Sequence, residues 1–248
     1  MSKLRPLVAF EITTTIKDLT IFYCIEFSMV AVTLLLTWLG RGSLDHPYFA
    51  CMESCAMIFI FIFGIFGFAE DFKMLLQNGF TRCYIFIATL ALFLQTAATL
   101  ALVDTLAARF LEGVAHGYWS LFTAIYGPNH TLWLQGLWRF GVYLVLVCVG
   151  YFCALTVTRL GTKRALILGI ALWCAGVVIL PMAFREWLPD ALRYDIGTGA
   201  ETFIYHCAGF TAEGVQLANP LLSLAVLAVL AVVGFAICFA LMRRAPLR

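Results

Sequence analysis

Residues 84–103 read YIFIATLALFLQTAATLALV, a run of twenty positions without a charged side chain. A transmembrane helix needs about 20 mostly apolar residues, and a continuous apolar run lacks the alternation of a membrane β-strand. Five further stretches have the same apolar character. The sequence therefore predicts six membrane spans, at about 19–39, 50–69, 84–103, 137–158, 165–184 and 219–242.

The composition of the whole chain agrees with this prediction. Apolar residues make up 63% of the 248 residues and charged residues 12%, whereas soluble chains contain roughly half and a quarter. So few charges could not cover the surface of a water-soluble particle, and a net charge of +2 is small for a phosphate-binding surface. These values exclude a cytosolic enzyme, a disordered protein and a nucleic-acid-binding protein. They favour an all-α, polytopic membrane domain over residues 19–248.

The basic residues predict the orientation of the spans, because an even number of spans places both termini on one side. Eleven basic residues fall on that side: Lys3, Arg5, Lys17, Lys73, Arg82, Arg159, Lys163, Arg164, Arg243, Arg244 and Arg248. Five fall on the other side: Arg41, Arg109, Arg139, Arg185 and Arg193. The positive-inside rule therefore predicts that both termini are cytoplasmic.

The segment before the first span has an amphipathic pattern. Leu4, Val8, Ile12 and Ile16 recur at every fourth position, with polar residues on the other faces. This pattern predicts an interfacial helix over residues 1–18, lying on the membrane surface before the chain turns into the bilayer. A frayed terminus is the alternative interpretation.

The predicted cytoplasmic connection between the second and third spans, residues 70–82, reads EDFKMLLQNGFTR. Asp71 favours the start of a helix through its charge and its capping oxygen. Asn78 and Gly79 form a left-handed stop signal for a helix. The sequence therefore predicts a separate helix of about two turns between these signals.

Three large apolar residues of this short helix, Phe72, Leu75 and Leu76, are spaced at i, i+3 and i+4 and share one face. An apolar helix face held at the membrane boundary suits docking into a groove of a partner protein. The spacing is equally compatible with the same face lying on the lipid headgroups.

A few polar residues occur inside the predicted spans, where they merit a functional hypothesis. Glu26 lies in the first span, and Gln95 and Thr99 lie in the third. They could form a polar surface along a substrate path or a subunit contact. Interhelical hydrogen bonds, worth about 1 kcal/mol each, are the alternative for the third span. The lone carboxylate of Glu26 is costly in lipid unless it is paired or protonated.

Sequence motifs for enzyme chemistry are missing. The chain has no Walker-type phosphate loop, no Gly-x-Ser-x-Gly elbow and no His-Glu-x-x-His pair, and its histidines fall outside the predicted spans. We therefore predict no catalytic residue, no metal site and no cofactor bound by this chain. The two long outer connections, 104–136 and 185–218, are rich in aromatic residues, which predicts short helices at the outer leaflet.

Taken together, the six spans, the amphipathic leader and the docking segment resemble the permease subunits of ABC exporters. The resemblance is to the type-2 class, in particular to small permeases of Gram-positive bacteria. It is carried by Glu70-Asp71-Phe72, by Leu75-Leu76-Gln77-Asn78-Gly79 and by Thr81-Arg82. The long connection 104–136 departs from what this class leads us to expect.

The resemblance implies a multi-pass protein of a bacterial cell membrane that exports an amphipathic substrate such as a peptide, lipid or drug. Segment 70–82 would be a coupling helix seated in a separate ABC ATPase subunit, which would bind ATP and Mg. Segment 185–218 would carry short re-entrant helices, and a second permease copy would complete the unit. The implied coupling residues are Asp71, Phe72, Leu75, Leu76, Asn78, Gly79 and Arg82.

Two other functions remain open from sequence. A non-transporting assembly factor or sensor would need spans beside a partner but no substrate path. A secondary carrier would need paired ionisable groups at mid-bilayer and broken helices, and only Glu26 is a candidate for such a group.

Overall fold

The computed structural model describes residues 4–41, 52–77, 79–115, 118, 120–174, 190–210 and 219–243. Within these ranges the chain is built from α-helices, which confirms the all-α prediction for this part of the chain. The helices are α1 (Leu4–Arg41), α2 (Met52–Gln77), α3 (Arg82–Val114), α4 (Leu121–Tyr126), α5 (Leu132–Leu160), α6 (Thr162–Cys174), α8 (Asp190–Cys207) and α9 (Pro220–Arg243).

Four of these helices are long and apolar enough to cross a membrane. They are Thr15–Gly40 within α1, Arg82–Val114, Leu132–Leu160 and Pro220–Arg243. At 1.5 Å per residue each exceeds a hydrocarbon core of about 30 Å. Four helices of this length and composition indicate a membrane protein.

The other two predicted spans stay a prediction. In α2, the described side chains include a shorter apolar stretch, Met52–Phe66. Helix α6 covers the first part of the predicted span 165–184, and residues 175–184 lie outside the described residues.

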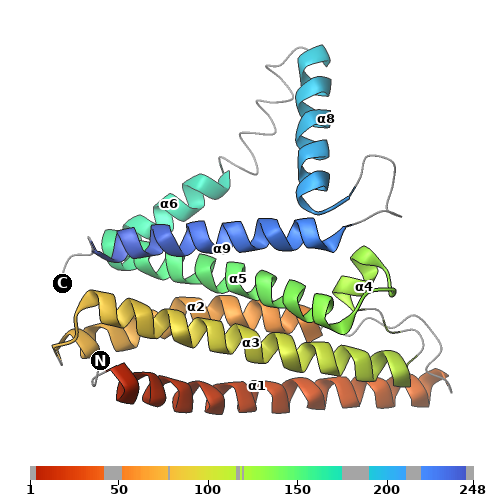
Figure 1. Ribbon diagram of the computed structural model, residues 1–248, viewed down its shortest axis with the longest axis horizontal. Coiled ribbons are helices and arrows are strands. Elements are labelled where there is room, and N and C mark those ends of the chain that lie inside the picture. Colours follow the sequence, from red (N-terminus) through yellow and green to blue (C-terminus); the bar gives the residue numbers. More distant parts are fainter. Residues whose placement is uncertain are drawn as a thin grey trace.

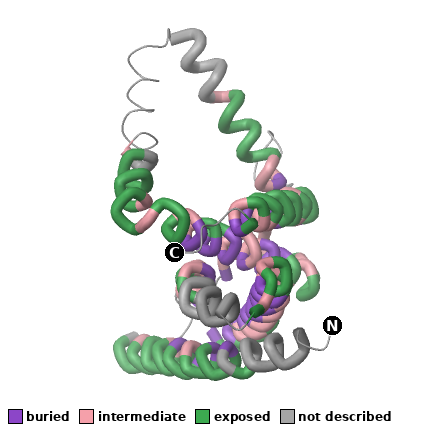
Figure 2. Tube along the Cα trace, turned by 90° about the vertical axis from the view of Figure 1, so that its left-hand side faces the viewer, coloured by how far each residue is buried: buried purple, intermediate pink, exposed green. Residues whose placement is uncertain are grey.

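Helices α1, α2, α3, α5 and α9 lie side by side along the long axis of the molecule (Figure 1). Helix α5 is at the centre of this bundle and packs against α2, α3 and α9, while α1 packs mainly on α3. The core contains large aromatic side chains of α3 and α5, among them Phe93, Tyr143 and Tyr151, each fully buried. Figure 2 shows this burial where the helices meet, with the outer faces of α1 and α9 exposed. Exposed apolar faces of this kind suit contact with lipid.

The closest helix crossing joins α2 to α5 through two glycines. A Cβ atom on Gly64 would lie 2.5 Å from the carbonyl oxygen of Val147, and one on Gly150 would collide with the carbonyl oxygen of Phe61. Small residues let two membrane helices approach to backbone contact, where dispersion forces are strongest. The two glycines therefore allow the close approach of α2 to the central helix.

Replacing Gly150 by valine should separate α2 from α5 and lower the melting temperature of the detergent-purified protein by many degrees, because backbone atoms cannot yield to the added side chain as flexible side chains do. Differential scanning fluorimetry measures this shift. Gly113→Ala in α3 is the matched control, since a Cβ atom there meets nothing within 4 Å. Similar melting temperatures for Gly150→Val and the wild type would contradict the close crossing.

Two predicted breaks are absent from the described helices. Helix α1 runs without interruption from Leu4 to Arg41, so the described part of the leader, residues 4–18, and the first span form one helix rather than two. Likewise α2 continues to Gln77, so no separate helix begins at Asp71. A capping residue is needed only where backbone N–H groups lack hydrogen-bond acceptors. At Asp71 the carbonyl oxygens of the preceding turn of α2 are these acceptors.

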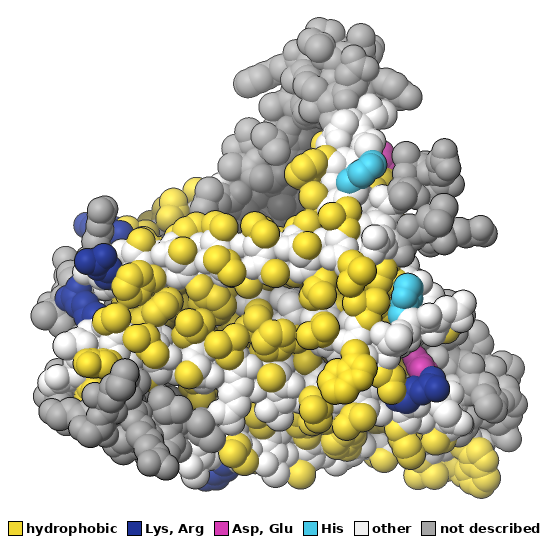
Figure 3. Space-filling model, viewed as in Figure 1, with side chains coloured by type: hydrophobic (Ala, Val, Ile, Leu, Met, Phe, Trp, Pro, Cys, Tyr) yellow, Lys and Arg dark blue, Asp and Glu magenta, His cyan; other side chains and the backbone are white. Residues whose placement is uncertain are grey.

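The turns and termini are divided between the two ends of the bundle. The start of α1, the α2–α3 turn, the α5–α6 turn and the end of α9 all lie at one end, on the left in Figure 1. A hydrogen bond of 2.7 Å from Arg82 Nη1 to the carbonyl oxygen of Arg243 joins α3 to α9 there. Figure 3 shows Lys and Arg side chains gathered at this end, beside a largely hydrophobic face over the bundle. We call it the basic end.

Candidate functional site

A buried ion pair joins α2 to α5 near the end of the bundle opposite the basic end. Glu53 lies in the first turn of α2, and Arg139 lies in the second turn of α5. The Arg139 side chain is 1% exposed, and its Nε and Nη2 atoms lie 2.7 and 2.6 Å from Oε1 of Glu53. Both Nε and Nη2 approach the same carboxylate oxygen. The bond from Nε is charge-assisted and therefore about twice as strong as a neutral hydrogen bond, whereas Nη2 has no hydrogen-bond partner among the described residues.

The remaining atoms of this pair bind two further elements. Arg139 Nη1 donates a 3.1 Å hydrogen bond to the Thr105 hydroxyl of α3. The second oxygen of Glu53 accepts the backbone N–H of Leu121, the first residue of α4. Burial, together with the Glu53 carboxylate, raises the pKa of the Tyr118 phenol, which stands before α4. The pair therefore fixes α2, α3, α4 and α5 relative to one another.

A second buried carboxylate lies beside this pair. Asp104 of α3 accepts hydrogen bonds from two phenols, at 3.0 Å from Tyr23 of α1 and also from Tyr143 of α5. The Tyr23 hydroxyl is also 3.3 Å from the carbonyl oxygen of Leu100. Two phenol donors satisfy a carboxylate that lipid could not solvate. We call Glu53, Arg139, Thr105, Asp104, Tyr23 and Tyr143 the polar network.

Glu26 of α1 lies next to the polar network but is not bonded to it. Its side chain is buried, with 4% exposed. Among the residues that the structure describes, neither carboxylate oxygen has a hydrogen-bond partner. The Asp104 carboxylate is near enough to repel it electrostatically. Glu26 differs in this from Glu53 and Asp104, because a buried carboxylate normally has a hydrogen-bond partner.

The other two residues of the predicted polar path contribute differently. Thr99 donates a 3.0 Å hydrogen bond to the carbonyl oxygen of Gln95, one turn earlier in α3. Both side chains are half-buried, and neither belongs to the polar network. Thr99 therefore bonds along its own helix, which is the usual behaviour of threonine in a membrane helix.

The structure corrects the sequence prediction at Asp104 and Arg139. Both were assigned to the predicted outer side, Asp104 as the start of the connection 104–136 and Arg139 as a basic residue of that side. Instead α3 continues to Val114 and both side chains are buried within the bundle. A charged residue ends an apolar run in the sequence, but a partner from another helix lets the run continue.

One sequence signal could have revealed the ion pair. Glu53, Asp104 and Arg139 each stand at the outer end of a predicted span, so all three come to the same depth on the same side. Opposite charges at equal depth in neighbouring spans favour pairing, because intramembrane charges need partners.

The predicted coupling segment lies at the basic end. Residues 70–77 are helical, and Gly79 has φ +76°, so the left-handed stop is confirmed at that glycine. Arg82 opens α3 and is held by its bond to Arg243. The side chains of Asp71, Phe72, Leu75 and Leu76, and the whole of Asn78, lie outside the described residues.

Comparison with known proteins finds no matching family model, no matching curated protein and no matching solved structure. Within the described part of the chain, no three His, Cys, Asp or Glu side chains are grouped as metal ligands. The site is a set of buried polar and charged groups from α1, α2, α3, α4 and α5. Within it, the Glu26 carboxyl group has no hydrogen-bond partner among the described residues.

Proposed function

We propose that this chain is the permease subunit of an ABC exporter of the type-2 class. A separate ATPase subunit binds ATP and Mg and drives it, and a second permease copy completes the transporter. The unit resides in a bacterial cell membrane and exports an amphipathic substrate, such as a peptide, lipid or drug. The sequence resemblance at 70–82 is the origin of this proposal.

One observation supports it above the others, which is the continuity of α2. This helix carries Glu53 in its first turn and Phe72, Leu75 and Leu76 in its last two turns. From residue 53 to residue 76 it spans about 35 Å as one uninterrupted helix. A helix of this length transmits a displacement at one end to the other, and here its ends are a predicted docking surface and a buried ion pair.

The proposed mechanism is a change between two packings of the bundle. Closure of the ATPase pair on ATP would push on the docking surface and shift α2 along α5. The Gly64–Gly150 crossing would guide this movement, since glycines present a smooth backbone surface. The Glu53–Arg139 ion pair would stabilise one packing of the bundle until closure of the ATPase pair displaces α2.

In this proposal the basic end is cytoplasmic. Eleven basic residues fall on that side. The opposite side has five, or four when the buried Arg139 is not counted. The excess of basic residues on the cytoplasmic side, on which the positive-inside rule depends, is therefore larger than in the count that includes Arg139.

Native purification of the tagged chain from its own membranes tests the proposal. We expect an ATPase carrying a Walker loop to be present in a one-to-one ratio, and ATP hydrolysis by the complex to rise on reconstitution into lipid. Quantitative mass spectrometry and a phosphate-release assay measure both. A chain that purifies with other membrane proteins and no ATPase would instead support the assembly-factor alternative.

A further inference from the structure

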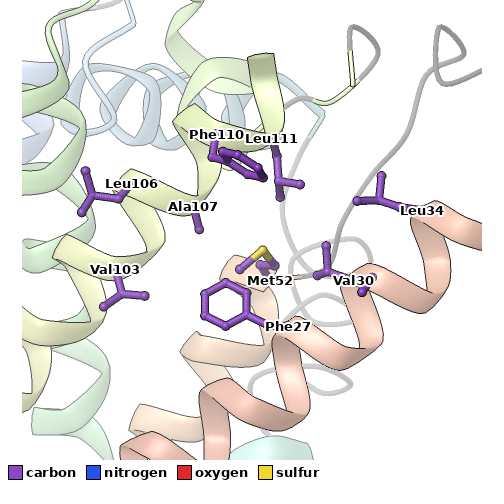
Figure 4. A pocket seen from close by; sticks show the side chains of 10 residues that line it. Phe27, Val30, Leu34, Met52, Val103, Leu106, Ala107, Phe110 and Leu111 are labelled. Carbon is purple, nitrogen blue, oxygen red and sulfur yellow. The ribbon is translucent and has the colours of Figure 1, made fainter. Parts of the chain in front are cut away.

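A groove of about 450 Å³ lies between α1 and α3. Its described lining is entirely apolar, and Figure 4 shows side chains of α1 and α3 converging on it with Met52 of α2. Its walls include Phe27, Val30 and Leu34 of α1 and Val103, Phe110 and Leu111 of α3. The volume falls in the range of small-molecule sites, roughly 300–1,000 Å³. We call it the α1–α3 groove.

The shape of the groove suits one alkyl chain. Its lining spans residues 27–34 on α1 and 103–111 on α3, which corresponds to about 10–12 Å along the helices. Leu106 and Phe110 on its rim are 60% and 69% exposed. In a membrane this rim faces the lipid tails, so an amphipathic molecule can enter from the bilayer.

Glu26 does not line the groove but lies within one helical turn of its lining on α1. Glu26 directly precedes Phe27 and stands one helical turn before Val30, on the same face of α1. On α3, Asp104 directly follows Val103. Glu26 and Asp104 therefore stand just beyond the same end of the apolar groove, next to the lining residues Phe27 and Val103.

Carboxyl groups outnumber basic side chains around this end. Three buried carboxylates, Glu26, Glu53 and Asp104, adjoin a single described guanidinium, that of Arg139. Arg139 is bound to Glu53, and Asp104 holds two phenols. Glu26 is the member of the three left without a bonded partner among the described residues. A lone carboxyl group in a membrane interior is either protonated or, when it is ionised, strongly favours a positive partner.

We propose that the α1–α3 groove binds an amphipathic organic cation, with the alkyl chain along the apolar walls and a protonated amine beside Glu26. After a change of rotamer, the Glu26 carboxylate accepts a charge-assisted hydrogen bond from the ammonium group. Binding of this cation is a property of the chain itself. That such a cation is the exported substrate rests on the proposed function above.

Photo-crosslinking in lipid nanodiscs tests this proposal. The full chain, alone in phosphatidylcholine nanodiscs, is exposed to a decylammonium probe with a diazirine at the end of its alkyl chain. We expect cross-links in the peptides that contain residues 27–34 and 103–111. Decylamine should compete at least tenfold better than decanol, because only the amine supplies the missing charge.

Four variants separate charge recognition from simple filling of the groove. Glu26→Gln should make decylamine compete no better than decanol, and Ala107→Leu, at a lining position, should remove cross-linking altogether. Glu201→Gln, the same change at an exposed position of α8, should leave the tenfold preference intact. Glu26→Asp keeps the charge and should keep part of the preference.

Equal competition by decanol and decylamine on the wild type would overturn the proposal, and this comparison needs no variant. A full amine preference in Glu26→Gln would also overturn it. Equal competition would mean that the groove takes an alkyl chain without recognition of charge, and a full preference in Glu26→Gln would mean that a group other than Glu26 recognises the amine. Because no ATPase is present in this assay, its failure leaves the permease proposal standing, and a failed ATPase purification leaves this binding test unaffected.

Discussion

Replacing Arg139 by methionine should lower the free energy of unfolding by about 3–5 kcal/mol, because Glu53 would remain buried without its cation. Arg139 and Glu53 are both almost fully buried, at 1% and 7% side-chain exposure, so water cannot replace the lost partner. An SDS titration in mixed micelles, followed by circular dichroism, measures the change. The reconstituted protein should also lose the close packing of α4 against Glu53.

The double variant Glu53→Gln, Arg139→Met should recover most of this loss, since removal of both charges leaves no uncompensated ion. The exposed pair of α3 supplies the control. Arg109 lies 3.5 Å from Glu112 with its side chain 66% exposed, so Arg109→Met should cost at most about 1 kcal/mol. If Arg139→Met lowered the free energy of unfolding no more than Arg109→Met does, the buried ion pair would not be stabilising the bundle.

The second large effect is expected at the docking surface. Leu75→Glu should reduce stimulation of the partner ATPase to its basal rate while the chain still inserts into the membrane. A carboxylate buried without a partner in an apolar groove costs about 3–5 kcal/mol, which is at least about 100-fold in affinity. ATP hydrolysis by the reconstituted complex measures the loss.

Met74→Glu is the matched control for this variant. It adds the same charge one residue away, on the opposite side of the helix from Phe72, Leu75 and Leu76. Stimulation should therefore persist in Met74→Glu. If both variants stimulate like the wild type, the last turns of α2 are not the ATPase contact.

The sequence predicted those features of the fold that depend on local chemistry. The apolar run at 84–103 identifies α3, and the run at 219–242 identifies α9, because hydropathy depends only on the residues in the window. The turn at Gly79 was also predictable, since a positive φ angle is a property of glycine itself.

The polar network was not predictable in the same way, because its partners are far apart in the chain. Glu53 and Arg139 are 86 positions apart, and Tyr23 and Asp104 are 81 positions apart. A window of 20 residues that reaches Asp104 contains a charge and none of the groups that neutralise it. Helix α3 therefore continues eleven residues beyond residue 103, where the third span was predicted to end.

Helix continuity was misjudged for a related reason. Asp71 and the polar residues around Lys17 have the composition of a helix boundary, and a boundary was predicted near each. Neither position contains a proline or an αL glycine that would stop the preceding helix. Helices α1 and α2 continue through both, which makes α2 a single rigid element.

The central claim is that an ATPase subunit contacts the end of α2 at the basic end. A photoreactive amino acid in place of Leu75, activated in intact cells, measures this contact directly, with the same substitution at exposed Trp133 near the other end as the control. The account predicts a cross-link from position 75 to a protein with a Walker loop, and none to it from position 133. A cross-link to that protein from position 133, or its absence from position 75, would contradict the account.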